Sequence, residues 1–306
     1  MNGVTRDDSA LTFRFGENWQ SFVATVDGGR IAAAEAGLLR LLPREALRGA
    51  RFLDIGCGSG LSALAALRLG AASVDAIDAD AASVAAARAL LERFAAGGAW
   101  IVEPASVFDL TPERRGTYDI VYSWGVLHHT GDLWRAVTCA CAMVRPGGRL
   151  AVALYRRTPL CGFWRWEKRL YAGAGPAMQR AVAALYKAAY RAGLLATGRN
   201  PAAYVAGYRS ARGMDWSHDV HDWLGGYPYE STDPATVATV LRDHGFALER
   251  SFEHRAAAAG LFGSHCDEYV CVRRGEPAMT QPQTVGSNRF VADRSGAGTP
   301  ERNAPM

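Results

Sequence analysis

The sequence lacks any long apolar run. None of its 306 residues belongs to a stretch of roughly 18 or more apolar residues, so no transmembrane helix is expected. The first ten residues are polar and include Asp7 and Asp8, which does not fit a secretory signal. A hydrophobic content of 49% and a charged content of 21% are typical of a soluble globular protein, and the length allows one large domain or two.

Paired cysteine motifs and a strong charge are also missing. The chain has six cysteines, and none forms a C-x-x-C pair. This usage predicts a reduced, cytoplasmic protein whose cysteines pack in the core rather than form a disulfide frame. The net charge of +4 does not by itself argue for a nucleic-acid partner.

The most informative stretch that is present runs from Phe52 to Gly60. A short apolar run ends in Asp54, three glycines alternate, and an Ala/Leu-rich segment follows over 61–69. This order predicts a strand, a tight turn and a helix. Glycine allows positive φ angles and lets a ligand lie against bare main chain, while the helix N-terminus offers free N–H groups and its positive dipole end. The loop is therefore expected to hold a ligand, the alternative being an ordinary turn.

The spacing of the glycines separates two kinds of cofactor. A dinucleotide fingerprint needs G-x-G-x-x-G, and position 61, where its last glycine would fall, holds Leu61. The pattern D-x-G-x-G-x-G instead resembles motif I of class I S-adenosyl-L-methionine (SAM) methyltransferases. The resemblance implies SAM as cofactor, with S-adenosyl-L-homocysteine (SAH) as product. It also implies that Asp54 orients the amino group of SAM and that the loop wraps its amino-acid end, through Gly56, Cys57, Gly58 and Gly60.

A second carboxylate closes the next predicted strand, 73–78. Asp78 lies 24 residues after Asp54, close to the offset of ~20 residues at which dinucleotide folds place a ribose-binding acid. A carboxylate at the C-terminal edge of a strand can accept both ribose hydroxyls, so Asp78, with Ala79 beside it, is the expected ribose ligand. Asp80 is the competing choice, or caps the helix predicted over 81–94.

Two further stretches carry the same family resemblance. The strand 118–124 and the residues up to His129 resemble the "fDlVxsxxvLHH" segment of ubiquinone-type small-molecule methyltransferases, and 145–150 resembles their "LkPGG" turn. After the strand predicted at 100–103, a small polar residue and an apolar one stand where related enzymes contact adenine. The cofactor contacts implied by these stretches are Ser106, Val107, Ser123 and Trp124.

The alternation of strands and helices predicts an α/β fold with a Rossmann-like, doubly wound sheet. The family fold implies seven strands, six parallel and one antiparallel, with the ligand crevice at their C-terminal edge. The expected division is an aromatic N-terminal arm or lid, a methyltransferase core in two pieces, a substrate-cap insertion and a disordered tail. These parts are 1–30; 31–155 and 231–274; 156–230; and 275–306.

The arm and the insertion carry the candidate substrate residues. The aromatic arm either staples itself to the core or folds over the bound ligands. The segment 216–230 crowds histidines, acids and aromatics, which indicates a substrate pocket, simple packing, or a divalent-metal site, although no recognised zinc or calcium pattern is present and no metal is expected. The candidate substrate contacts are Trp19, Trp216, His218, Trp223, Tyr227 and Tyr229.

A helix predicted over 176–192 has two unlike sides. Arg180, Lys187 and Arg191 share one side, while Met178 and Leu185 project from the other. The favoured interpretation is a solvated basic face over a packed apolar face, the alternative being a surface for anionic lipid or substrate.

Methyl transfer needs the acceptor, the methyl group and the sulfur held in line, and a base where the acceptor is a hydroxyl. An imidazole suits that task, so His128 and His129 are candidates, with His221 and Asp222 in the insertion; a structural role is the alternative for the histidine pair. Motifs for amine-methylating, cytosine-methylating and RNA-binding enzymes are absent, which favours a small-molecule acceptor reacting at oxygen, nitrogen or carbon. A non-catalytic SAM-binding module and a nicotinamide oxidoreductase remain open alternatives.

Overall fold

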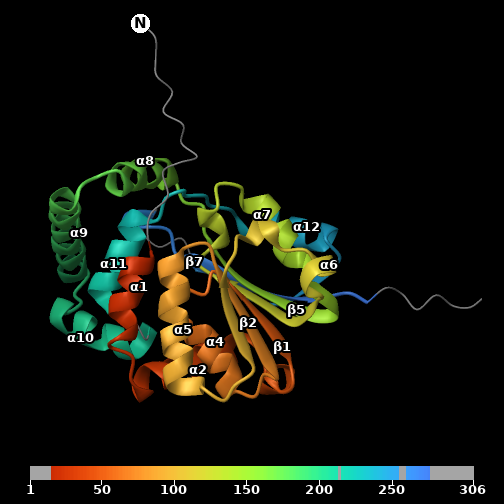
Figure 1. The fold of residues 1–306 in the computed structure, drawn as a ribbon. Helices are drawn as coiled ribbons and strands as arrows, with labels where there is room; N and C mark the ends of the chain where they lie inside the picture. The colour runs from red at the N-terminus through yellow and green to blue at the C-terminus, as the bar shows by residue number, and fades with distance from the viewer. Residues whose placement is uncertain (1–14, 213–214, 255–259, 276–306) are drawn as a thin grey trace, which may run out of the picture. The chain divides into compact units, whose positions relative to one another are not determined.

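The computed structural model describes residues 15–212, 215–254 and 260–275. These residues contain a seven-stranded sheet of order β3-β2-β1-β4-β5-β7-β6 (Figure 1). Strand β7 runs antiparallel to both of its neighbours, and the other pairs are parallel. The predicted fold, with six parallel strands and one antiparallel strand, is therefore confirmed. The strands are β1 (Arg51–Ile55), β2 (Ser73–Asp78), β3 (Trp100–Pro104), β4 (Tyr118–Trp124), β5 (Val144–Tyr155), β6 (Phe246–Phe252) and β7 (Cys266–Arg273).

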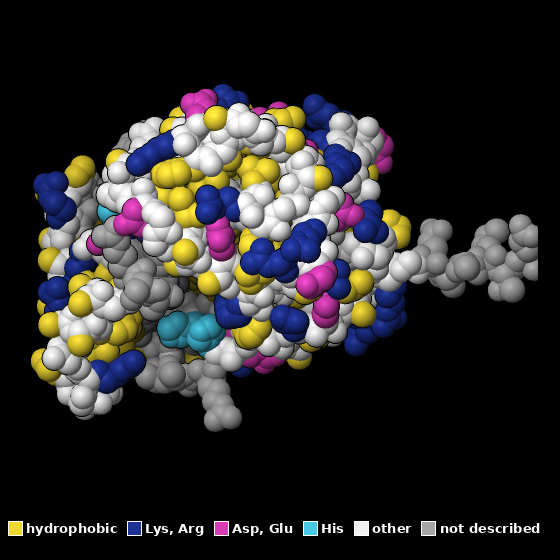
Figure 2. All heavy atoms as spheres, turned by 90° about the horizontal axis from the view of Figure 1, so that it is seen from below, with side chains coloured by type: hydrophobic (Ala, Val, Ile, Leu, Met, Phe, Trp, Pro, Cys, Tyr) yellow, Lys and Arg dark blue, Asp and Glu magenta, His cyan; other side chains and the backbone are white. Residues whose placement is uncertain are grey.

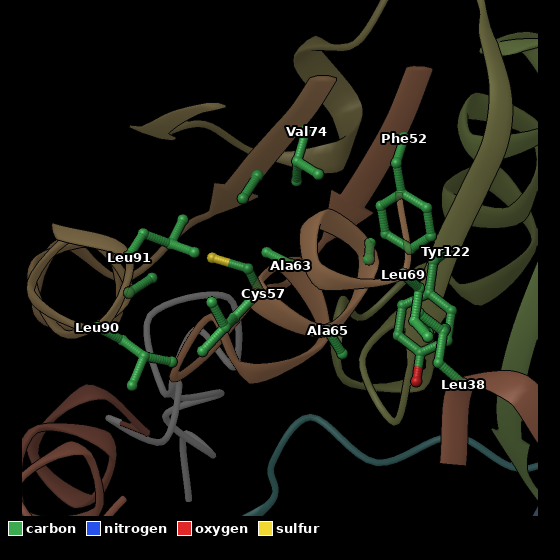
Figure 3. Close-up of a cluster of buried hydrophobic side chains, with 14 of the residues drawn as sticks. Leu38, Phe52, Cys57, Ala63, Ala65, Leu69, Val74, Leu90, Leu91 and Tyr122 are labelled. Atoms are coloured by element: carbon green, nitrogen blue, oxygen red, sulfur yellow. The ribbon is translucent and has the colours of Figure 1, made fainter. Parts of the chain in front are cut away.

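Helices cover both faces of the sheet, which explains why the central strands are apolar on both sides. One face packs on α2 (Gly28–Leu41), α4 (Leu61–Arg68) and α5 (Ala81–Ala95), and the other packs on α7 (Leu133–Ala142) and α12 (Pro234–Asp243). Figure 3 shows the first of these cores, with the Cys57 thiol pointing into it toward Leu91. The short elements are α3 (Arg44–Leu47), η2 (Val107–Asp109), α6 (Pro112–Arg115) and η3 (Leu127–His129).

Aspartates define where several helices begin. The side chain of Asp80 accepts a hydrogen bond from the Ala82 N–H at 2.8 Å, so Asp80 caps α5 as the alternative interpretation held. Asp27 caps α2 in the same way through the Arg30 N–H. Such caps satisfy N–H groups that the helix itself leaves unpaired. Because α2 begins at Gly28, the predicted boundary of the arm at residue 30 falls inside this helix.

The insertion forms helices that lie together on one side of the sheet (Figure 1). They share an aromatic core that includes Trp164, Tyr208 and Trp216. They also belong to the same compact unit as the sheet, so the insertion is not a separate unit. The predicted tail lies outside the described residues except for Gly275. The helices are α8 (Cys161–Ala172), α9 (Pro176–Ala196), α10 (Pro201–Arg212) and α11 (Trp216–Gly225).

The two sides of α9 are placed differently from the prediction. Met178 and Leu185 are 60% and 72% exposed, so the expectation of a packed apolar face is wrong at these positions. Lys187 donates to the Ser217 hydroxyl at 2.9 Å, and the Arg191 guanidinium lies 5.0 Å from the Trp216 ring centre. Long cationic side chains can cover an aromatic ring while their charge stays in water, so α9 turns part of its basic side toward α11.

The surface shown in Figure 2 has basic, acidic and apolar side chains interspersed, and no single sign of charge dominates that face. Within the described residues, no helix combines the length and the apolar character that crossing a membrane requires.

The placement of α9 can be tested by a pair of leucine substitutions. Leu185→Gln should change the free energy of unfolding by no more than ~0.5 kcal/mol, because the side chain is exposed. Leu90→Ala should lower it by ~2–5 kcal/mol, because Leu90 is fully buried in the core of Figure 3. Urea denaturation of both variants measures the difference. Equal losses in the two variants would contradict an outward-facing Leu185.

Candidate functional site

A cavity of about 2270 Å³ opens at the C-terminal ends of β1, β2 and β4 and extends beneath the cap helices. A single drug-sized ligand usually occupies ~300–1,000 Å³, so the cavity has room for two molecules side by side. One end is lined by the glycine loop and the acids Asp54 and Asp78. The other end is lined by aromatic and acidic residues of α11. The edge at which the sequence predicted the ligand crevice is thus where the cavity lies.

The glycine loop is closed tightly by three neighbouring elements. Gly56, Gly58 and Gly60 have φ angles of +72°, +53° and +77°, a region that side chains other than glycine rarely adopt. A Cβ atom added at Gly56 would lie 2.3 Å from the Val126 side chain, and one at Gly58 would lie 3.0 Å from the Trp19 ring. At Gly56 and Gly58 the loop therefore presents main chain to the cavity.

Two carboxylates stand beside the loop. Asp54 is 2% exposed, and its Oδ2 has no hydrogen-bond partner among the described residues. Burial, and then the nearby Asp78 charge, raise the pKa of Asp54 to about 7. Asp78 accepts hydrogen bonds from the Gly58 N–H at 3.0 Å and the Asp80 N–H at 2.9 Å, while burial raises its pKa. Together, Asp54 and Asp78 supply negative charge at this end of the cavity, and their carboxylate oxygens can accept hydrogen bonds from a ligand.

Most of the predicted cofactor contacts line this cavity, and two do not. Ala79, Ser106, Val107 and Trp124 lie along it with the loop residues. Gly60 instead begins α4 and packs against Ala87, which a Cβ atom would approach to 2.8 Å. Ser123 is fully buried, and its hydroxyl donates to the Ile55 carbonyl at 3.0 Å inside the sheet. The Ser123 hydroxyl therefore does not face the cavity.

His128, the first candidate base, does not line the cavity. It is fully buried, and its Nδ1 accepts the Tyr155 N–H at 3.2 Å. The neutral ring then carries its proton on Nε2, which has no partner within the described part of the chain. Burial, followed by His129 and Lys168, lowers its pKa well below the usual range. The His128 ring therefore contacts the end of β5 and does not face the cavity.

His129 lines the cavity, but it is a weak base. Its Nδ1 lies 2.7 Å from the Pro228 carbonyl oxygen, so Nδ1 carries the proton and donates it. Burial lowers the pKa of His129 to about 3, although the carbonyls of Pro228 and Gly226 oppose this. His129 therefore stays neutral near pH 7 and fixes the segment 226–228 against the end of β4.

Of the candidate site residues in α11, some line the cavity and others do not. His218 approaches the Ser21 hydroxyl at 2.9 Å, and the His221 Nδ1 lies 2.8 Å from the Tyr171 hydroxyl; neither side chain lines the cavity. Asp222 does line it, and its Oδ1 accepts the Asn18 amide at 2.9 Å. Burial raises the pKa of Asp222 well above its usual range, and the Asp219 charge adds to this. Asp222 is thus the predicted catalytic residue that lines the cavity and has a raised pKa.

The predicted aromatic substrate residues lie where expected. Trp19, Trp216, Trp223, Tyr227 and Tyr229 all line the cavity. The crowded segment from 218 to 222 sends its side chains to different partners, and no group of three His, Cys, Asp or Glu residues in the described ranges is arranged to hold a metal ion.

The sequence analysis missed the helix that connects the two ends of the cavity. Helix α1 (Gly16–Val23) places Asn18 against Asp222 and Trp19 over Gly58, while the Gly16 N–H donates to Asp80 at 2.9 Å. The aromatic content of the arm was the available signal, since Trp19 and Phe22 are three residues apart on one helical face. Within the described part of the arm, residues 16–23 therefore form a helix that contacts both ends of the cavity.

The second missed feature is a buried carboxylate in β7. Glu268 accepts two hydrogen bonds of 2.6 Å from the Arg40 guanidinium and one of 2.8 Å from the Trp124 indole N–H. All three residues line the cavity. Because Glu268 is 5% exposed, it holds Trp124 at the end of β4 beside the predicted cofactor site.

Removing this carboxylate should be costly. Glu268→Ala leaves the Trp124 N–H and a half-exposed guanidinium without this acceptor, and we expect a loss of ~1–3 kcal/mol in the free energy of unfolding. Glu268→Gln should lose less, because the amide oxygen still accepts one bond. The matched control is Glu249→Ala, which removes a carboxylate that is more exposed than Glu268 and pairs with Arg149; it should change stability by ~0–1 kcal/mol. Urea denaturation compares the three variants, and equal losses from Glu268→Ala and Glu249→Ala would refute the role of Glu268.

Comparisons with known proteins agree with this geometry. A family model described as a methyltransferase domain matches residues 26–251. A ubiquinone biosynthesis O-methyltransferase of Xanthomonas euvesicatoria is 37% identical over 116 residues, which cover 38% of this chain and 47% of that protein. Its namesake in Methylocella silvestris is 32% identical over 177 residues, covering 51% of this chain and 66% of the relative. The chain thus spans about half the length of the first of these curated relatives.

A solved structure shows a similar fold. The SAM-bound magnesium protoporphyrin IX methyltransferase of Synechocystis PCC 6803 is 15% identical to this chain and superposes with a TM-score of 0.52. The superposition covers 89% of this chain and 100% of that structure.

Proposed function

We infer the function from one premise: the chain belongs to the methyltransferase-domain family, whose model covers residues 26–251. We propose that it transfers the methyl group of SAM to a small-molecule acceptor held beneath the cap helices. The observation that supports this most directly is one cavity with two unlike ends. One end pairs the glycine loop with Asp54 and Asp78, and the other is aromatic and carries Asp222.

The residues at the first end fit SAM. Gly56 and Gly58 offer main chain where a Cβ atom would be crowded, and the Oδ2 of Asp54, which has no partner among the described residues, suits the amino group of SAM. Asp78 is the proposed ribose ligand, and Ser106 and Val107, which line the cavity, are the proposed adenine contacts. SAM, when bound, supplies the electrophilic methyl group and the leaving sulfur. The protein supplies alignment, which can contribute ~7–11 kcal/mol at best.

At the second end, the residues orient the acceptor and hold its proton. Tyr155 and Trp223, with ring centres 5.3 Å apart, form a wall that excludes water. Burial raises the pKa of Asp222 well above its usual range, and the Asn18 amide fixes the carboxyl group by donating to its Oδ1. His128 and His129 are neutral, and they contact the main chain at the end of β5 and in the segment 226–228. Asp222 is thus the proposed general base.

A cytoplasmic location is part of the same proposal. All six cysteines are free in the structure, and Cys57, Cys141 and Cys271 are buried. Free, packed thiols are typical of proteins kept in a reducing compartment.

The cofactor site is tested by two substitutions. Gly58→Val should abolish binding of SAH, because a side chain at this positive φ angle meets the Trp19 ring. Asp78→Ala should abolish it by removing the ribose acceptor. The control is Gly97→Val, at a glycine whose added Cβ meets nothing within 4 Å, which should keep the wild-type affinity. Isothermal titration calorimetry with SAH measures all three, and undiminished affinity in both site variants would overturn the assignment.

The raised pKa of Asp54 predicts how binding depends on pH. Because the folded protein holds this carboxyl group protonated up to a pKa of about 7, its contribution to the stability of the ligand-free protein falls as pH rises from ~4 to ~7. Pairing with the amino group of the ligand needs the ionised form. The affinity for SAH should therefore increase from pH 5.5 to 7.5, by at most ~10-fold per unit from this group, and then level.

Asp54→Asn supplies the comparison for this pH dependence. The variant should bind SAH more weakly at pH 8 and show a slope reduced by up to one proton below pH ~7. The raised pKa of Asp78 acts in the same direction and accounts for any slope that remains. Identical pH profiles for the variant and the wild type would show that Asp54 does not pair with the ligand.

A further inference from the structure

The outer side of helix α8 is apolar although it faces solvent. The inner side packs into the cap through its buried residues, which are Trp164, Lys168 and Tyr171. On the opposite side, at spacings of three and four residues, stand Phe163, Trp166 and Leu170. Each of these three side chains is more than half exposed. A surface helix usually turns polar residues toward water, so α8 carries an unusual apolar surface.

The outer side of α9 is apolar as well. The exposed Met178 and Leu185 belong to a stripe whose members follow one another at alternating spacings of three and four residues, so they share one side of the helix. All six members are apolar and exposed: Met178, Ala181, Leu185, Ala188, Ala192 and Leu195. Only residues 173–175 separate α8 from α9, so the two helices meet at one corner of the cap (Figure 1).

Exposed apolar residues are concentrated at this corner. Of the ten large hydrophobic residues that are exposed in the described ranges, six belong to α8 and α9. Single exposed apolar residues are normal on a protein surface, whereas a group of them marks a place of interaction. The apolar sides of α8 and α9 therefore indicate a docking surface.

The charge of the same segment is strongly positive. Residues 161–200 contain seven Lys or Arg residues and one acid, Glu167, which gives a formal net charge of +6, whereas the whole chain carries +4. Glu167 is not exposed, and the adjacent Lys168 is the opposite charge that acts on it. The exposed charged residues of this range are all arginines: Arg165, Arg169, Arg180, Arg191 and Arg199. Charge complementarity therefore favours an anionic partner.

The contacts of the arginines on α9 leave their charge in place. The guanidinium of Arg191 lies 5.0 Å from the ring centre of Trp216, and that of Arg199 lies 6.0 Å from the ring centre of Tyr204. Both rings are neutral. Acids of other elements act on two cations of the segment, Glu230 on Arg165 and Asp215 on Lys187.

A second copy of this chain does not suit this surface. In a twofold dimer a patch meets itself, so the arginines of one copy would face those of the other and repel them. An anionic lipid surface satisfies both features, because Trp, Phe and Leu side chains enter the boundary between headgroups and acyl chains while arginines lie beside the phosphates. Trp166, in the middle of the apolar side of α8, is of the residue type enriched at membrane–water interfaces.

We propose that the corner formed by α8 and α9 docks on a membrane surface that contains anionic phospholipid. Trp166, Leu170 and Met178 enter the headgroup region, and the exposed arginines lie beside lipid phosphates. An anionic lipid surface was the alternative interpretation of α9, and the apolar side of α8 extends it. The docking is separate from methyl transfer and does not depend on it. Because Trp166 also lines the cavity, the docked corner borders the cavity.

Co-sedimentation of the full-length protein with lipid vesicles tests the docking. Vesicles of phosphatidylcholine alone are compared with vesicles of phosphatidylcholine and phosphatidylglycerol in equal parts. The protein should bind the mixed vesicles at least ~10-fold more tightly, and the difference should shrink at high salt because exposed charges are screened. Equal binding to both kinds of vesicle, or binding to neither, would overturn the proposal. Binding to soluble poly-L-glutamate with no binding to vesicles would overturn it in favour of an acidic protein partner.

Two variants locate the docking surface. The double variant Leu170→Gln/Met178→Gln makes two exposed side chains polar, so the fold should persist, and binding to the mixed vesicles should weaken by ~10-fold or more. Arg180→Glu replaces an exposed positive charge on α9 with a negative one and should weaken the same binding by ~5-fold or more. Undiminished binding in both variants would contradict docking through this corner.

Matched controls change the same kinds of residue elsewhere. Ile101→Gln/Leu248→Gln alters exposed apolar side chains of β3 and β6, the two edge strands of the sheet. Arg114→Glu reverses an exposed charge on α6. Both controls should bind the mixed vesicles as the wild type does, and losses equal to those of the α8 and α9 variants would overturn the assignment. A dimer in size-exclusion chromatography that Leu170→Gln/Met178→Gln dissociates would show that a second copy covers this surface and would also overturn it.

Discussion

The crowding around the Gly56–Gly60 loop is the constraint on which the rest of the site depends. Each of its three glycines faces a different element: the segment after β4, helix α1 and helix α5. The N–H groups of Gly56 and Cys57 both donate to the Ile77 carbonyl, at 2.8 and 3.0 Å. The loop therefore ties the end of β1 to the end of β2, and this brings Asp54 and Asp78 together. Burial of two like charges at one place raises the pKa of both, and a cationic ligand can relieve the repulsion.

Helix α1 extends this constraint across the cavity. Its Trp19 closes over Gly58 at the cofactor end, and its Asn18 holds Asp222 at the acceptor end. The hydroxyl of Ser21 adds a contact to His218 on α11. One short helix thus contacts both the proposed cofactor site and the proposed acceptor site. Its displacement would uncover the loop and release the Asp222 carboxyl group together, so the two sites are physically linked through α1.

The sequence was most informative where position along a strand decides the outcome. The ends of β1 and β2 place Asp54 and Asp78 at the cavity, and β4 spans 118–124 as predicted. How deeply a side chain is buried, and which way it faces, were harder to predict. Neighbouring residues in a strand point to opposite faces, so Trp124 lines the cavity while Ser123 is buried in the sheet. The motif that contains His128 gives its place in the chain, whereas its burial depends on β5, which supplies the Tyr155 N–H.

Contacts between distant parts of the chain were beyond sequence reasoning. Arg40 and Glu268 are 228 residues apart and meet only because β7 inserts between β5 and β6. On α9, the apolar side of the helix was predicted to be the buried face. The interior of the cap is aromatic, however, and its rings accept Lys187 and Arg191, so apolar residues such as Leu185 are left outside.

Acidic side chains line both ends of the cavity. The chain as a whole carries a net charge of +4, yet the cavity is lined by Asp54 and Asp78 at one end and by Asp219 and Asp222 at the other. In a site with little water, such charges act strongly on a bound ion. In the proposed reaction SAM is more positive than SAH, so an acidic cavity binds the methyl donor more favourably than the product.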